Sequence, residues 1–210
     1  MKKISLVLFA LVIGLMLPTI KADAAIVMSG STTYTNTNFD AVVYWEVFSP
    51  FDAASPLGSI SDYGYYYQVH NSGGTGDNAL TQFGVNDPLK LPVTSAGYLI
   101  TDIHGNAFNL DGLSGSVAPN LITKAGDYGI FDSCAVWTFQ APPISLGHDG
   151  YVLYFTTPFQ PVIVNGGVQA GSFNTEGPVP GPAPEPASMA LFGLGLLGFV
   201  GKVIRKKFNA

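Results

Sequence analysis

The strongest constraint on this chain is a series of short segments in which apolar and polar residues alternate. Between residues 25 and 174, Gly, Ser, Thr, Asn and aromatic residues dominate, and no stretch has the apolar spacing of an amphipathic helix. Strict alternation is typical of strands with one buried face. Clusters rich in Gly, Asn and Asp separate the segments at 71–78, 109–116 and 146–150, and they indicate turns.

The alternating pattern predicts the fold class. It is clearest at 41–48, 63–69, 134–140, 151–157 and 160–173. We interpret the last segment as strands around a turn at Asn165-Gly166. Eight to ten strands at about this spacing predict an all-β fold, an antiparallel β-sandwich over residues 25–174, and leave jelly-roll and immunoglobulin-like topologies both open.

The N-terminal segment has the three parts of a secretory signal. Lys2 and Lys3 precede an uncharged apolar run at 4–17, and Ala22 and Ala24 supply the small residues of a cleavage site. We therefore predict a signal peptide over 1–24, which needs the Sec translocon and signal peptidase as partners. The alternative is an uncleaved anchor helix.

The C-terminal segment predicts a membrane helix over 187–204. At 1.5 Å per residue this run spans roughly 27 Å, close to the hydrocarbon thickness of a bilayer. Basic residues lie at its end: Lys202, Arg205, Lys206 and Lys207. Such residues stay on the cytoplasmic side, so the domain is expected outside the inner membrane, which agrees with the N-terminal signal. A buried core helix is the competing interpretation.

A proline-rich stretch precedes this helix. Proline occupies every second position from Pro178 to Pro186. Because proline lacks a backbone donor, we expect residues 175–184 to form an extended linker that does not join a sheet.

The C-terminal elements together resemble a known sorting signal. Within 184–210 the chain has, in order, Pro184-Glu185-Pro186, the apolar run and the basic cluster. The run "APEPASMALFGLGLLG" is similar to the sequence pattern of PEP-CTERM signals. Such signals occur in exopolysaccharide-producing Gram-negative bacteria. The resemblance implies an exosortase as partner, which would cleave near the motif and release or transfer the protein from a membrane-anchored precursor to the cell envelope or outside the cell.

Charge and cysteine content exclude several functions. The span 25–184 holds twelve acidic residues against two basic ones, a formal charge of −10. Such a surface repels phosphate backbones, so no nucleic-acid partner is expected. The lone Cys134 cannot form an internal disulfide, and its apolar neighbours predict a buried side chain rather than a nucleophile.

No catalytic motif or metal-binding spacing stands out. "GTGDNA" at 74–79 formally matches a nucleotide-binding pattern, but the next residues predict a strand, so we expect a loop. The histidines lack ligand spacing and are expected in loops: His70, His104 and His148. No cofactor is predicted, although four aspartates in or near turns leave a calcium site open: Asp102, Asp111, Asp132 and Asp149.

The aromatic residues give the best indication of a ligand. Alternation places Tyr63, Tyr65 and Tyr67 on the core face and Tyr66 on the other, so Tyr66 is the expected contact for a sugar ring. The leading hypothesis is a non-enzymatic envelope or extracellular-matrix protein associated with exopolysaccharide or biofilm. A carbohydrate-binding module and a secreted hydrolase are the alternatives.

Overall fold

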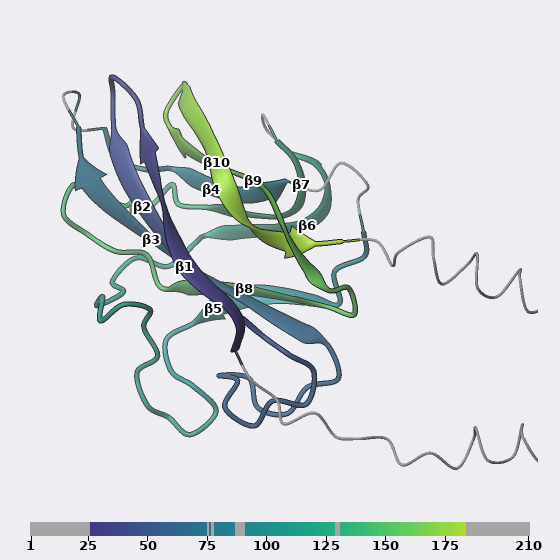
Figure 1. Cartoon of the computed structure of the whole chain (residues 1–210). Helices are drawn as coiled ribbons and strands as arrows, with labels where there is room; N and C mark the ends of the chain where they lie inside the picture. Colours follow the sequence, from purple (N-terminus) through teal and green to yellow (C-terminus); the bar gives the residue numbers. More distant parts are fainter. Residues whose placement is uncertain (1–25, 75, 77, 87–90, 129–130, 184–210) are drawn as a thin grey trace, which may run out of the picture.

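Ten strands make up the computed structural model (Figure 1), which describes residues 26–183 except 75, 77, 87–90 and 129–130. The strands are β1 (Ile26–Thr35), β2 (Asp40–Phe48), β3 (Tyr63–Gly73), β4 (Gln82–Asn86), β5 (Ser95–Leu99), β6 (Leu121–Tyr128), β7 (Phe131–Thr138), β8 (Val152–Thr157), β9 (Pro161–Ala170) and β10 (Phe173–Pro182). The predicted signal peptide (1–24) and membrane helix (187–204) lie outside this range. Within the described part of the chain, no helix is long and apolar enough to cross a bilayer.

The strands form two five-stranded antiparallel sheets, which confirms the predicted all-β sandwich. The first sheet has the order β1-β2-β3-β8-β5 and the second β10-β9-β4-β7-β6. Hairpins join β1 to β2, β6 to β7 and β9 to β10. The connections β3–β4, β4–β5, β5–β6, β7–β8 and β8–β9 each cross from one sheet to the other. The residues of "GTGDNA" belong to the β3–β4 connection, and a strand follows them as predicted.

The inner faces of both sheets meet in one aromatic core. Tyr65 and Tyr67 of β3 are fully buried there, and Tyr63 packs against the same cluster, as the alternation predicts. Trp137 of β7 also lies in this core, and its Nε1 donates to the Gly97 carbonyl of β5 across the sandwich at 2.8 Å. The alternating pattern thus encodes which face of each strand is buried.

A second, smaller cluster covers the outer face of the first sheet. It comprises the buried residues Phe48, Tyr66, Leu110 and Val152. Leu110 comes from the long β5–β6 connection, and the Tyr66 hydroxyl shares a hydrogen bond of 2.8 Å with Ser55 Oγ of the β2–β3 connection. These connections therefore act as a partial third layer, so the face of β3 that carries Tyr66 does not face solvent.

The segment at 160–173 differs from its predicted form. It contains one continuous strand, β9, and the turn lies at Gly171-Ser172 rather than at Asn165-Gly166. Gly166 is instead required by packing, because a Cβ there would lie 2.6 Å from Val179 Cγ2 and 3.0 Å from the Tyr34 hydroxyl. The Asn-Gly pair signals close approach of a neighbour rather than a hairpin turn.

The predicted linker at 175–184 is also wrong over most of its length. Residues 175–182 belong to β10, which pairs with β9 in unbroken register up to Pro182 opposite Pro161. Alternate prolines are compatible with this pairing because β10 is an edge strand. Just beyond β10, the Ala183 N–H donates to the Gln160 carbonyl at 2.8 Å. Since hydrogen-bonded positions alternate along an antiparallel pair, the odd-numbered residues of β10 are those whose backbone groups face β9. The prolines lie at the intervening positions, where the missing N–H would have faced outward.

The outward carbonyls of these prolines close one side of the sandwich. Thr32 Oγ1 of β1 donates to the Pro178 carbonyl, and the Tyr67 hydroxyl donates to the Pro180 carbonyl at 2.5 Å. Figure 1 shows the purple β1 running alongside the yellow-green β10, the edge strands of the two sheets. The free edge of β10 therefore offers no backbone N–H donor at its prolines, and two of the proline carbonyls already accept hydrogen bonds from hydroxyl groups of the first sheet. Both features protect the β10 edge from pairing with a strand of another chain.

Candidate functional site

The position where the chain leaves the sandwich lies next to the predicted sorting motif. The last four residues of β10, from Val179 to Pro182, are buried, and Ala183 is still bonded to Gln160. The motif residues Pro184, Glu185 and Pro186 follow directly and, like the basic residues after 201, lie outside the described residues. The predicted spacer between domain and motif is therefore replaced by a folded edge strand.

Tyr66 is not the exposed aromatic residue that alternation suggested. It points away from the main core, as predicted, but its exposed fraction is 0%. The rings of Phe48 and Phe108 both pack edge-on against it, with centroid distances of 5.4 Å and 5.8 Å. Burial raises the pKa of its hydroxyl to about 12. The prediction of Tyr66 as a ligand contact is wrong because loop residues cover the outer face of β3.

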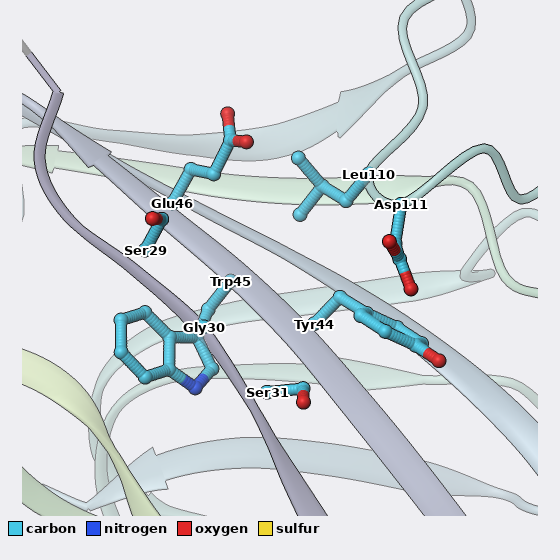
Figure 2. Close-up of a pocket in the computed structure, with 8 residues that line it drawn as sticks. All are labelled: Ser29, Gly30, Ser31, Tyr44, Trp45, Glu46, Leu110 and Asp111. Carbon is cyan, nitrogen blue, oxygen red and sulfur yellow. The ribbon is translucent and has the colours of Figure 1, made fainter.

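A groove on the uncovered part of the same face is the better candidate site (Figure 2). It lies where the loop layer ends and the outer face of the β1–β2 ribbon begins, and its volume is about 280 Å³. It is lined by Ser29, Gly30 and Ser31 of β1, Tyr44, Trp45 and Glu46 of β2, and Leu110 and Asp111 of the β5–β6 connection. Figure 2 shows the loop residues Leu110 and Asp111 beside Tyr44 and Glu46.

Strand register places the polar groups of the groove on one face. Ser29 pairs with Glu46 and Ser31 with Tyr44, and directly opposite residues in an antiparallel pair project to the same side. Val43 and Val47 of β2 are buried in the core, so Tyr44 and Glu46 lie on the opposite face of the strand. No sequence pattern indicated Leu110 and Asp111, because a loop brings them to the strands.

Carboxylates dominate the electrostatics of the groove. Burial raises the pKa of Tyr44, and the adjacent Asp111 carboxylate adds to this effect through its charge and through a hydrogen bond from the Tyr44 hydroxyl. Half-burial raises the pKa of Glu46. Figure 2 shows the carboxyl groups of Glu46 and Asp111 pointing in different directions rather than toward a shared point.

Asp111 lies in a tight turn with a left-handed backbone. Its φ is 50° and that of Gly112 is 72°, and the Leu113 N–H donates to the Leu110 carbonyl at 3.1 Å, as in a type I′ turn, for which Asp-Gly is a favoured pair. The preceding residue is fixed, because the Leu110 N–H donates to Oε1 of the fully buried Gln68 at 2.7 Å. Gln68 in turn donates to the Gly150 carbonyl at 3.1 Å. A buried amide on β3 thus holds the loop that places Asp111 in the groove.

A second hollow, of about 490 Å³, lies elsewhere on the outer face of the first sheet. Leu57, Ile60 and Tyr154 supply its apolar lining, and hydroxyl groups and one carboxyl group complete it. The hydroxyl residues are Ser61, Thr94, Ser95 and Thr156, and the carboxyl group is that of Asp62. Its described lining residues include one carboxylate, whereas the groove over Tyr44 has two, so the groove over Tyr44 is the more distinctive site.

The histidines do not converge on a metal site. His70 lies within β3 rather than in a loop, and its Nδ1 is 2.5 Å from Asp149 Oδ1. His104 and His148 are exposed, in different connections. Across the described residues, no group of three His, Cys, Asp or Glu side chains is placed to hold a metal ion.

Two of the four aspartates considered for calcium, Asp102 and Asp111, share the β5–β6 connection, but the described residues include no group of three side chains placed to hold a metal ion. Asp102 Oδ1 accepts the backbone N–H groups of Asn106 and His104, each at 2.8 Å, and these bonds, that of Asn106 first, lower its pKa. Asp111 lies in the groove and Asp149 pairs with His70. Asp132 lies within β7, opposite Asp127 of β6.

Cys134 is buried in the core, as predicted, and its thiol contacts the Val85 carbonyl with an Sγ···O distance of 3.6 Å. Its surroundings are apolar side chains of the sandwich core. Burial of this kind disfavours the thiolate that nucleophilic chemistry needs.

Comparison with known proteins identifies the C-terminal segment but not the sandwich. No curated protein and no solved structure matches the chain. The family model for the PEP-CTERM protein-sorting motif matches residues 182–206, beginning at the last residue of β10. This match confirms the resemblance of the residues around Pro184-Glu185-Pro186. Residues 182–206 are a PEP-CTERM protein-sorting motif, which implies an exported protein that an exosortase processes.

Proposed function

We propose that the chain is the precursor of a non-enzymatic envelope or extracellular-matrix protein. The Sec translocon exports it, signal peptidase removes residues 1–24, and the helix at 187–204 holds it at the inner membrane. An exosortase then cuts near Pro184-Glu185-Pro186 and passes the sandwich to the outer surface or the extracellular matrix. The observation that carries this proposal is the sorting-motif match at 182–206, which begins at the last residue of β10, the final strand of the folded domain.

Two properties of the sandwich support a structural or binding role. The carboxylates of the groove, Glu46 and Asp111, point in different directions in Figure 2, whereas a glycoside hydrolase needs two carboxyl groups that flank one bond. The Cys134 thiol is enclosed by the core and cannot meet a substrate. A polysaccharide matrix is the proposed destination, and because the domain is acidic, its polysaccharide partner is expected to be uncharged.

Deleting residues 184–210 is expected to convert the protein from an envelope-processed form into a freely secreted one. The deletion removes the motif, the predicted membrane helix and the basic cluster while leaving every strand intact. Fractionation and immunoblotting in a host that carries an exosortase would measure the change.

The matched control is Glu185→Ala, which alters the motif but keeps the helix and basic residues. It should leave an unprocessed, membrane-bound precursor. If wild type, deletion and Glu185→Ala all gave the same location and mature mass, the sorting proposal would be rejected.

A further inference from the structure

The groove over Tyr44 is formed by paired strand residues on its floor and by a loop on one side. Two pairs form the floor, Ser29 with Glu46 and Ser31 with Tyr44, all on the outer face of the β1–β2 ribbon. Residues two apart on a strand are separated by about 7 Å, so the hydroxyl groups of Ser29 and Ser31 repeat along the groove at this spacing. The wall is the loop at Leu110 and Asp111, fixed from beneath by Gln68.

The chemistry of the lining restricts the ligand. Glu46 and Asp111 offer carboxylate oxygens, which accept hydrogen bonds, and the serine hydroxyls both donate and accept. None of the described residues that line the groove is basic, so a phosphate, sulfate or uronate would meet repulsion without a counter-charge. The partly exposed Tyr44 ring supplies an apolar surface of the kind that packs on the face of a sugar ring.

The carboxyl group of Asp111 is positioned by a tight turn. The Leu113 N–H donates to the Leu110 carbonyl at 3.1 Å, and the two central residues, Asp111 and Gly112, both have positive φ. Asp-Gly is a favoured pair for a type I′ turn of this kind. The turn places the Asp111 carboxylate beside the Tyr44 hydroxyl, at the wall of the groove.

We infer that this groove binds an uncharged, hydroxyl-rich polysaccharide chain. Glu46 and Asp111 accept hydrogen bonds from sugar hydroxyls, Ser29 and Ser31 bond along the chain, and the Tyr44 ring packs against one sugar face. The side chains of Ser29, Ser31, Tyr44 and Glu46 project from the outer face of the β1–β2 pair, so the occupant packs on side chains and does not pair with the backbone as an added β-strand would. This inference deepens the proposed function, because it gives the exported domain a ligand class.

Affinity electrophoresis of the full chain tests the inference, in a detergent without a sugar headgroup. The gels contain dextran, a β-glucan, a galactomannan, the neutral matrix polysaccharide of the producing host, or alginate as the uronate polymer. At least one neutral polymer should retard the protein and alginate should not. Free glucose should compete poorly if the groove binds several units of a polymer, whereas full competition by glucose would show a monosaccharide site and overturn the polymer assignment.

Variants on the groove locate the binding. Asp111→Asn removes the charge but keeps a residue type that tolerates positive φ, and Ser29→Ala removes one exposed hydroxyl. We expect Asp111→Asn to weaken binding at least fivefold and the double variant further, without lowering the melting temperature. Thr33→Ala is the matched control, since Thr33 is exposed on the same face of β1 but outside the groove.

Three results would overturn the assignment: no retardation by any neutral polymer, equal or stronger retardation by alginate, or unchanged binding in the double variant. The measurement does not depend on export or processing. A negative result would therefore leave the sorting proposal standing, and failure of sorting in the deletion experiment would leave the groove untouched.

Discussion

Replacing Trp137 by alanine is expected to lower the free energy of unfolding by about 3–5 kcal/mol, the range for large buried aromatic residues. Trp137 is fully buried and stacks on Phe83 with a centroid distance of 5.9 Å. Its Nε1 also satisfies the Gly97 carbonyl on the opposite sheet, which the variant would leave without this donor. Urea unfolding followed by far-UV circular dichroism would measure the loss.

The other tryptophan is the matched control. Trp45 is partly exposed at the rim of the core. Trp45→Ala should therefore lower the free energy of unfolding by about 1–2 kcal/mol less than Trp137→Ala does. The chain has two tryptophans, so each variant leaves one fluorescent reporter of unfolding. Equal losses for the two variants would contradict the assignment of Trp137 as the link between the sheets.

Gly74→Ala is expected to destabilise the sandwich by at least about 3 kcal/mol, because it combines backbone strain with a steric clash. Gly74 has a φ of 128°, outside the left-handed well that alanine tolerates at moderate cost. A Cβ there would lie 2.7 Å from Phe39 Cα and 2.9 Å from Asp40 N, backbone atoms that cannot move aside by a rotamer change. Thermal unfolding monitored by circular dichroism measures the effect.

Gly105 provides a control that separates strain from clash. It also has positive φ, 81°, but a Cβ added there would meet no described atom within 4 Å. Gly105→Ala should therefore cost only about 1 kcal/mol. If Gly74→Ala were no worse than Gly105→Ala, the close packing of the β3–β4 connection against the start of β2 would be refuted.

The alternation of apolar residues predicted the fold class and the buried faces of the strands. The prediction for β3 was accurate because Tyr65, Tyr67 and Val69 meet the opposite sheet, where period-two spacing decides burial. It failed for Tyr66 because the β2–β3 and β5–β6 connections fold back over the outer face. Loops that cover a sheet leave no periodic signal in the sequence.

The predictions for the prolines and glycines near the C-terminus were wrong for a related reason. Pro178 and Pro180 resemble a linker when considered alone, but on an edge strand their missing donors face outward and their carbonyls accept Thr32 and Tyr67. Gly166 resembles a turn residue, yet it makes room for Val179. Both assignments depend on a neighbouring strand that is remote in sequence.

Part of the candidate groove could be predicted from the sequence. Tyr44 and Glu46 could be placed on the outer face of a strand from the spacing of Val43 and Val47. Ser29 and Ser31 needed the β1–β2 register, and Asp111 needed the tertiary position of a loop. The sorting motif is the opposite case, because its information is local and the family model recovers it at 182–206 without any fold.

The most direct test of the whole account is the intact mass of the mature protein isolated from a host with an exosortase. We expect a polypeptide that begins at residue 25 and ends close to Pro184-Glu185-Pro186, with or without an attached group, so that the complete sandwich is retained and residues 187–210 are absent. A mature protein whose mass still includes residues 187–210 would contradict processing at the motif.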